Sequence, residues 1–157
     1  MFGGIAHQAE DLLDQPRVVL VVAQTRESAQ ARAYATERLH RFGELARVVA
    51  IIFEEFERAL AGGRAEWKTS GRILKLVLYG SHARGDWVDD PVGGYRSDYD
   101  ILVVVSDARL TDPVDVWSAT EDRLIREVTV ARALSAPVNL IVHDIADLNR
   151  QIELGRP

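Results

Sequence analysis

The chain contains no cysteine, which excludes a disulfide scaffold and a thiolate zinc site. Positive charge is not in excess either: 19 Lys and Arg stand against 24 Asp and Glu, a formal net charge of -5. The molecule as a whole therefore lacks the positive field with which nucleic-acid-binding proteins capture phosphate backbones. Its apolar runs are all shorter than the roughly 18 residues of a membrane span, and its first residues include no basic cluster. We expect a cytoplasmic protein without a membrane segment and without a strong nucleic-acid signal.

The chain has enough apolar sequence for a globular core. Hydrophobic residues make up 47% of its 157 residues, and charged residues 27%. The apolar positions from Leu45 to Leu60 recur with helical spacing and predict an amphipathic helix that ends at Gly62. Short apolar runs predict strands at 73–79, 100–105 and 138–143, and further helical patterns run from 112 to about 135 and from 144 to 154. These elements predict an α/β (α+β) fold, in which a small mixed β-sheet is flanked by helices.

The first forty residues are harder to interpret. Residues 17–22, "RVVLVV", favour a strand and a helix about equally, because periodicity cannot separate the two in so short a run. Residues 27–41 favour a helix. We therefore divide the chain into an N-terminal extension of uncertain, partly helical structure at 1–43 and a main domain at 44–157.

A glycine and a serine follow the first predicted strand of the main domain. Gly80 and Ser81 precede "HARGD", which has helical propensity, so free backbone N–H groups and a hydroxyl lie at a predicted helix start. Phosphate is held well at such a start, because unsatisfied donors and the positive end of the helix dipole point at the anion. Arg84 is placed to add a fixed charge. A plain corner between a strand and a helix has the same pattern.

Two aspartates open the next predicted strand. Asp98 and Asp100 are separated by one residue, so their carboxylates leave the same face, roughly 6 to 7 Å apart along the strand. Such a pair suits a hard cation such as Mg²⁺, which prefers oxygen ligands. The alternative is a solvated strand entrance where aspartates merely end a loop. A phosphate cradle facing a carboxylate pair is the arrangement that metal-assisted nucleotide chemistry needs.

Together, residues 80–85 ("GSHARG") and 97–100 ("SDYD") before an apolar strand resemble the Gly-Ser … Asp-x-Asp signature of the polymerase-β-like nucleotidyltransferases. The chain is similar in particular to the minimal nucleotidyltransferases that are paired with, or fused to, a helical HEPN domain. The resemblance covers roughly residues 45–157. It implies a polymerase-β palm-like fold and attack by an acceptor hydroxyl on the α-phosphate of ATP or another nucleoside triphosphate. It also implies a helical HEPN-type protein as partner or fused domain.

The same resemblance assigns roles to individual residues. Gly80 and Ser81 would hold the triphosphate, and Arg84 and Ser97 would be further nucleotide contacts. Asp98 and Asp100 would be catalytic and would bind magnesium, most simply as two Mg²⁺ ions.

The chain departs from the family at one position. The third carboxylate that such proteins commonly carry on the next core strand corresponds to Asn139 here. An amide can offer an oxygen to a metal, but it cannot take a proton at neutral pH. Asn139 is therefore a possible site residue, and the chain is either an enzyme or a nucleotide-binding protein without turnover.

The segment from Asp86 to Arg96 is long for a connection between neighbouring elements. It contains Trp87 and Tyr95, and it is interpreted either as a lid that stacks an aromatic ring on the base or meets the acceptor, or as a surface loop whose aromatics pack on the domain. Arg96 is a possible phosphate contact or an exposed arginine. His82 either touches ligand or packs locally.

Three functions stay open from the sequence. The leading one is a Mg²⁺-dependent nucleotidyltransferase that moves AMP onto a hydroxyl acceptor, which could be a protein partner of a toxin-antitoxin-like pair. The second is an antitoxin-like module that binds nucleotide and masks a HEPN ribonuclease without catalysis. The third is a small-molecule nucleotidyltransferase of the aminoglycoside-modifying kind. It would need an acidic pocket for a cationic acceptor, which Asp86, Asp89 and Asp90 leave open.

Overall fold

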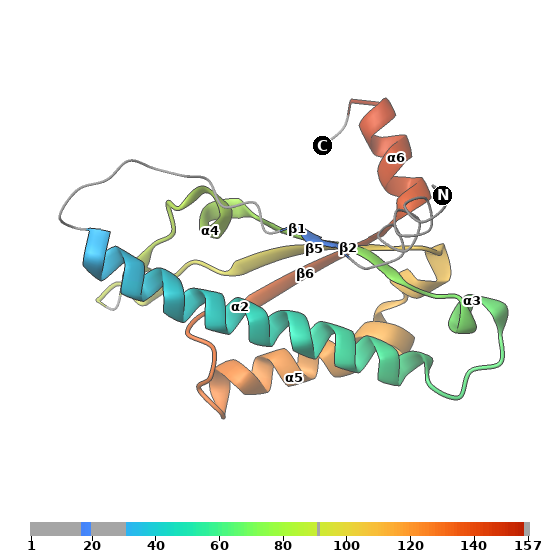
Figure 1. Ribbon diagram of the computed structural model, residues 1–157, viewed down its shortest axis with the longest axis horizontal. Coiled ribbons are helices and arrows are strands. Elements are labelled where there is room, and N and C mark those ends of the chain that lie inside the picture. The colour runs from blue at the N-terminus through green and yellow to red at the C-terminus, as the bar shows by residue number, and fades with distance from the viewer. Residues whose placement is uncertain (1–16, 20–30, 91, 156–157) are drawn as a thin grey trace, which may run out of the picture.

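Four strands form one mixed sheet in the order β1-β2-β5-β6. They are β1 (Arg17–Val19), β2 (Ile73–Tyr79), β5 (Tyr99–Val105) and β6 (Val138–Asp144). These bounds come from a computed structural model that describes residues 17–19, 31–90 and 92–155. β2 and β5 are antiparallel, whereas β1 is parallel to β2 and β6 is parallel to β5. The predicted class, a small mixed sheet with helices, is confirmed (Figure 1).

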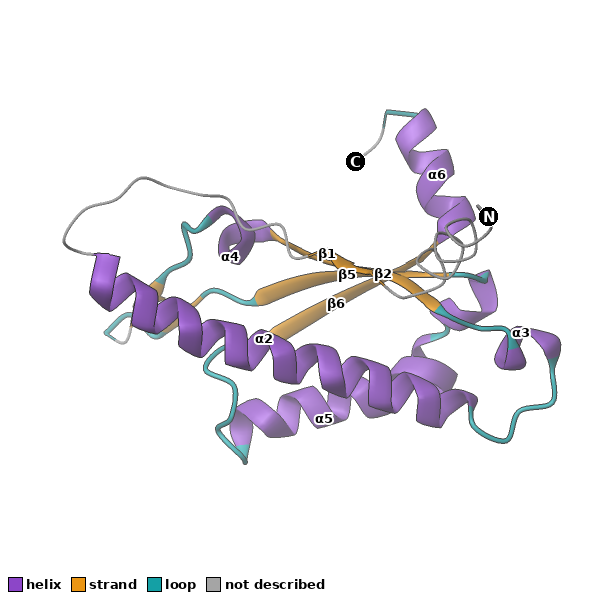
Figure 2. Ribbon diagram, viewed as in Figure 1, coloured by secondary structure: helices purple, strands orange, loops and turns teal. Residues whose placement is uncertain are grey.

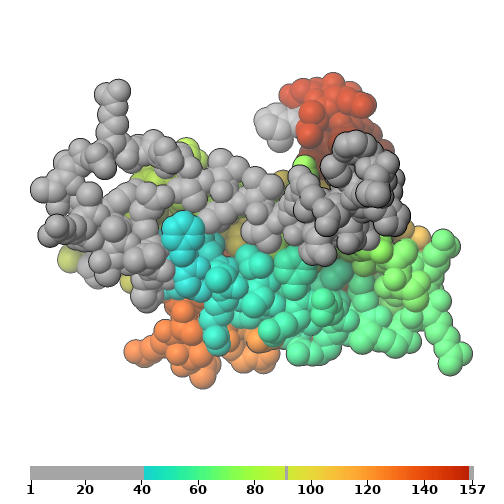
Figure 3. Space-filling view, viewed as in Figure 1, coloured from blue at the N-terminus to red at the C-terminus, as the bar shows by residue number. Residues whose placement is uncertain are grey.

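One face of this sheet is covered by two helices, α2 (Ala31–Leu60) and α5 (Ser118–Thr129) (Figure 1). The apolar side chains of α2 meet alternate residues of β5, because successive side chains of a strand point to opposite faces. The main members of this core are Val48, Ile51, Ile52, Ile101, Val103, Trp117 and Leu124, all at most 3% exposed. Figure 3 shows the outward side chains of α2 and α5 as adjoining bands on one side of the molecule.

The face of the sheet opposite α2 and α5 carries the strand residues that alternate with those of the core. The register pairs Tyr79 of β2 with Asp100 of β5, and Asp100 with Asn139 of β6. The adjacent row consists of Val77, Leu102 and Ile141. Asp100 therefore points away from the helical core, which faces its neighbours Tyr99 and Ile101.

Short elements fill the connections. They are α3 (Glu66–Thr69), α4 (Gly80–Arg84), the hairpin of β3 (Asp89–Asp90) and β4 (Tyr95–Arg96), a 3₁₀ turn (Ala108–Thr111), a π-helical turn (Pro113–Trp117) and α6 (Ile145–Glu153). Figure 2 shows α6 leaving the sheet on the side opposite α2 and α5. Among the described residues, no helix is both long enough and apolar enough to cross a membrane.

The predicted strands and helices are confirmed with small shifts in their bounds. Residues 17–19 form a strand, while residues 20–22 lie outside the described part of the chain. The predicted helix at 27–41 and the predicted helix at 45–60 are one helix, described from Ala31 to Leu60. The proposed division between residues 43 and 44 falls inside this helix and stays a prediction.

The helix expected from residue 112 begins with an irregular turn and ends early. Asp112 caps its start by accepting hydrogen bonds from the backbone N–H groups of Val114 and Asp115, as the Asp-Pro pair predicts. A π-helical turn then precedes the regular helix, which ends at Thr129 rather than near residue 135. Trp117, at the end of this turn, is buried, and its ring N–H donates to the Leu110 carbonyl at 2.7 Å.

Candidate nucleotide and metal site

The glycine-serine turn lies where β2 ends. α4 starts at Gly80 directly after Tyr79, its N-cap residue, whose side chain does not cap the first turn. Gly80 has a φ of +71°, a backbone conformation that side chains disfavour. A Cβ added there would lie 2.3 Å from Oδ2 of Asp100. The two halves of the sequence motif therefore touch, and only glycine allows an approach this close.

The aspartate pair lies at the start of β5. Asp98 is exposed, Asp100 is partly buried, and Tyr99 between them is fully buried on the opposite face. The Asp100 carboxylate therefore lies on the face that the helices leave uncovered. Asp98 directly precedes the strand, and its place on the same face stays a prediction. Burial raises the pKa of the nearby Tyr79 hydroxyl, and the negative charge of Asp100 raises it further.

Asn139 lies beside Asp100, at the position where the sequence resemblance places a third carboxylate. Its side-chain amide donates a hydrogen bond from Nδ2 to Oδ1 of Asp100 at 3.2 Å. A carboxylate has about four lone-pair sites, so one such bond leaves most of the acceptor capacity of Asp100 in place. The site thus combines two carboxylates with one amide.

The residues present fit a magnesium ion. Asp98, Asp100 and the amide oxygen of Asn139 offer the hard oxygen ligands that Mg²⁺ prefers, and a magnesium site usually needs only one or two carboxylates besides water and phosphate. The Asp100 carboxylate lies directly against the backbone of Gly80, so an ion bound to it would lie next to the glycine-serine turn. Within the described residues, no group of three or more His, Cys, Asp or Glu side chains is arranged to hold a metal by itself.

Ser97, which the resemblance implies as a nucleotide contact, is only 5% exposed. Its hydroxyl accepts a hydrogen bond from the backbone N–H of Val88 at 3.0 Å, and its own N–H donates to the Val88 carbonyl at 2.9 Å. Ser97 thus holds the base of the hairpin. Its role toward a nucleotide stays a prediction.

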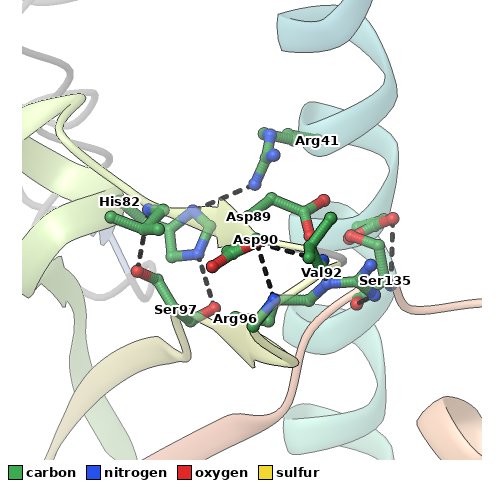
Figure 4. A network of polar contacts seen from close by, with 11 residues as sticks. Arg41, His82, Asp89, Asp90, Val92, Arg96, Ser97 and Ser135 are labelled. Atoms are coloured by element: carbon green, nitrogen blue, oxygen red, sulfur yellow. Dashed lines mark hydrogen bonds and ion pairs between the residues drawn. The ribbon is translucent and has the colours of Figure 1, made fainter.

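Two arginines near the motif form ion pairs at the surface. Arg84 contacts Asp86 at 3.2 Å, with both side chains more than half exposed. Arg96 contacts Asp89 at 3.1 Å and also donates to the Ser135 carbonyl (Figure 4). Asp86 and Asp89, two of the three acids that leave open a pocket for a cationic acceptor, are therefore paired with arginines.

The long segment after the motif is a hairpin. Asp90 Oδ1 closes its turn by accepting from the N–H groups of Val92 and Gly93. Trp87 packs at the base of the hairpin, where its ring is parallel to that of His82 at a centroid distance of 5.8 Å. The side chains of Val92 and Tyr95 are 96% and 62% exposed. Local packing is therefore what the structure shows for both His82 and Trp87.

α2 contributes two polar residues to this region that sequence reasoning missed. The Arg41 guanidinium lies over the Trp87 ring at 4.4 Å and donates from Nη1 toward His82 Nδ1 at 3.3 Å (Figure 4). Glu44, only 4% exposed, accepts from the Tyr99 hydroxyl at 2.7 Å. Both residues lie at helical spacing from the core residue Val48, on the apolar stripe of the helix. A polar residue on such a stripe was the sequence signal that could have identified them.

The Glu44 carboxylate also fixes the segment before β6. It accepts from the backbone N–H of Ser135 at 3.1 Å and from the Ser135 hydroxyl at 2.9 Å. One buried carboxylate therefore joins α2, the start of β5 and the approach to β6. Burial raises the pKa of the Tyr99 hydroxyl strongly, and its bond to Glu44 raises it further, so the hydroxyl stays protonated and donates.

We compared the chain with protein-family models, with curated proteins and with solved structures, and none of the three comparisons gave a match.

Proposed function

We propose that the chain is a Mg²⁺-dependent nucleotidyltransferase with a polymerase-β palm-like fold, which transfers a nucleoside monophosphate, AMP in the leading case, to a hydroxyl acceptor. In this reaction the acceptor oxygen bonds to the α-phosphorus, and the bond from that phosphorus to the oxygen that bridges it to the β-phosphate breaks. Pyrophosphate leaves with that oxygen, and the hydroxyl proton passes to solvent water. The proposal rests on the sequence resemblance and on one observation of the structure.

That observation is the contact between the two motif halves. Tyr79, Asp100 and Asn139 are register partners in neighbouring strands, and α4 begins at the end of the first of them. Gly80 then approaches Asp100 so closely that a Cβ would lie 2.3 Å from its carboxylate. A phosphate held at the turn would accordingly lie next to a cation held by the aspartates.

Each residue has a defined part in the proposal. Asp98 and Asp100 would hold magnesium, which when bound supplies charge neutralisation to the phosphates. Gly80 and Ser81 would hold the triphosphate at the start of α4, with Arg84 as an added charge. Asn139 cannot act as a base, because an amide takes no proton at neutral pH; it orients the Asp100 carboxylate by hydrogen bonding.

The test is transfer of label from ATP carrying a labelled α-phosphate. The purified chain would be incubated with Mg²⁺ and host lysate, and, in parallel, with purified small-molecule acceptors such as aminoglycosides. Asp98→Asn and Asp100→Asn remove the negative charge at nearly constant shape and are the controls. Label on a protein or small molecule only with both aspartates intact supports the proposal. Equal labelling by the variants contradicts it.

A second candidate is a nucleotide-binding module without turnover, which masks a helical ribonuclease as an antitoxin does. The observation that favours it is the amide of Asn139, which occupies the place of a third carboxylate and donates to Asp100. Asn139→Asp separates the two candidates. If the amide is what prevents turnover, this change creates or raises label transfer, by about a hundredfold for a restored general base.

The control for that experiment is Asn149→Asp, the same chemical change at an exposed position of α6. A gain in Asn139→Asp but not in Asn149→Asp favours the module without turnover. Full activity of the unmodified chain removes this candidate.

A further inference from the structure

His82 belongs to the first half of the sequence motif and contacts residues from several other segments of the chain. It lies in α4, one residue after Ser81, and is partly buried. Its ring is 4.2 Å from that of Tyr99 and is stacked on Trp87. Its Nε2 lies 3.1 Å from the carbonyl oxygen of Ser97, the residue before Asp98 (Figure 4). The imidazole therefore joins the turn of the first motif half to the backbone of the second.

The partners of the two ring nitrogens determine its hydrogens. The Ser97 carbonyl can only accept, so Nε2 carries the hydrogen that is donated to it. The Arg41 guanidinium can only donate, so Nδ1 has a free lone pair that accepts from Nη1 at 3.3 Å. The ring is thus neutral, with its hydrogen on Nε2. Burial lowers the pKa of His82, although its bond to Ser97 opposes the shift, and a neutral ring agrees with this direction.

α4 holds the entrance of β5 from two sides. Gly80 approaches the carboxylate of Asp100 on the open face, while His82 reaches Tyr99 and the Ser97 carbonyl on the side of α2. Ser97 is bonded in turn to Val88 at the base of the hairpin through both its hydroxyl and its N–H. A change in the bond from His82 therefore reaches the backbone that orients Asp98.

We propose that His82 is a positioning residue, whose Nε2–H sets the backbone of Ser97 and thereby aligns the Asp98 and Asp100 carboxylates with the phosphate-binding turn. The inference rests on the proposed function, because it assigns His82 a part in that same site. In this role His82 acts through the Ser97 carbonyl rather than through contact with nucleotide or metal. Groups that orient metal ligands in this way typically change metal affinity or activity by about 10- to 100-fold when they are replaced.

Two substitutions separate hydrogen bonding from packing. His82→Phe keeps a flat ring between Trp87 and Tyr99 but has no donor. His82→Gln loses the ring but keeps an N–H donor of similar reach. Calorimetry would measure the affinity for ATP in the presence of Mg²⁺, with circular dichroism to check that each variant is folded.

If His82 positions the site, His82→Phe weakens Mg²⁺-dependent ATP binding by about tenfold or more, while His82→Gln stays closer to the unmodified chain. Unchanged affinity in His82→Phe overturns the inference, because packing of the ring alone would produce that result. A loss in His82→Gln as large as in His82→Phe also overturns it, because the retained N–H donor would then have no effect on binding. A second readout needs no variant: ¹⁵N NMR of the unmodified chain should show Nε2 protonated and Nδ1 bare. A hydrogen on Nδ1 overturns the inference as well.

Asp98→Asn shows whether a negative result concerns only the role of His82 or the proposed function as a whole. If Asp98→Asn does not weaken Mg²⁺-dependent ATP binding, the proposed site itself is wrong. If Asp98→Asn weakens it and His82→Phe does not, only the role of His82 is wrong.

Discussion

Gly80 combines a positive φ with a close contact. Any other residue would bear the cost of the left-handed conformation, roughly 1 to 2 kcal/mol, and would also push its Cβ into the Asp100 carboxylate. We expect Gly80→Ala to lower stability by about that amount and to abolish Mg²⁺-dependent ATP binding. Chemical denaturation would measure the first effect and calorimetry the second.

Gly62 offers the matched control. It has a φ of +74°, and a Cβ added there would meet nothing within 4 Å. Gly62→Ala should therefore show the same backbone cost with unchanged ATP binding. Equal loss of binding in both variants would mean that strain, rather than displacement of Asp100, is responsible.

At the scale of single residues, sequence reasoning brought Gly80 and Asp100 together correctly but missed Glu44. The proximity of Gly80 and Asp100 can be predicted, because each residue belongs to a short motif at one end of a predicted strand and the two strands are neighbours in the chain. Glu44 cannot be placed in that way, because its partners Tyr99 and Ser135 are distant in the chain and meet it only after the sheet has formed. Ser97 was predicted from its place in the motif, yet its hydroxyl is bonded to Val88.

Among the elements, α2 and α5 are joined by ion pairs as well as by apolar packing. Arg47 binds Glu127 with two hydrogen bonds, of 2.6 and 2.9 Å, and Arg123 contacts Glu54 and Glu55 at 2.7 Å each. The bond from Arg58, followed by that from Arg123, lowers the pKa of Glu55, and the bond from Arg47 lowers the pKa of Glu127. These carboxylates are more acidic in the folded chain than in the unfolded chain.

This difference predicts loss of stability in acid. Where the unfolded chain binds more protons than the folded chain, the free energy of unfolding falls as pH falls. The stabilisation by Glu55 and Glu127 is therefore complete above the ordinary pKa of 4.5 and is lost as pH falls through and below it. Thermal melts at neutral pH and at about pH 4 would show the decrease in the melting midpoint.

Glu127→Gln should lower the melting midpoint at neutral pH and reduce its further drop in acid. Glu57→Gln, at an exposed position of the neighbouring helix α2, is the comparison, and it should leave both quantities near those of the unmodified chain. The prediction is wrong if the two variants lose the same stability on acidification.

At the level of elements, the buried strands and the main helices were predictable, because β2, β5 and β6 each consist mostly of apolar residues and α2 has a clear apolar stripe. The hairpin of β3 and β4 was not. Its strands have two residues each, too few for any periodicity, and side-chain bonds of Asp90 and Ser97 hold it instead. The strand character of residues 17–19 depends on pairing with β2, which a local pattern does not contain.

The whole molecule has a helical core on one face of the sheet and the candidate site on the other. Stability and binding should therefore respond to different substitutions. Ile52→Val removes one methyl group from a fully buried position of α2 and should cost about 0.5 to 1.5 kcal/mol of stability, with ATP affinity unchanged in the folded protein.

Asp98→Asn should have the opposite effect: ATP affinity is lost, while stability is kept or slightly raised. Stability does not fall, because the change removes the repulsion between the like charges of Asp98 and Asp100. Denaturation curves and calorimetry on both variants would test this separation. Weaker ATP binding in Ile52→Val would show that the two faces of the sheet are coupled.

The site also has an order of assembly along the chain. The glycine-serine turn and both aspartates belong to the antiparallel pair of β2 and β5, which the residues between Tyr79 and Tyr99 connect. Asn139 lies on β6, beyond α5, and joins only after that longer connection has closed. During synthesis the pair of β2 and β5 therefore leaves the ribosome first, and the amide that holds Asp100 is the last member of the site to arrive.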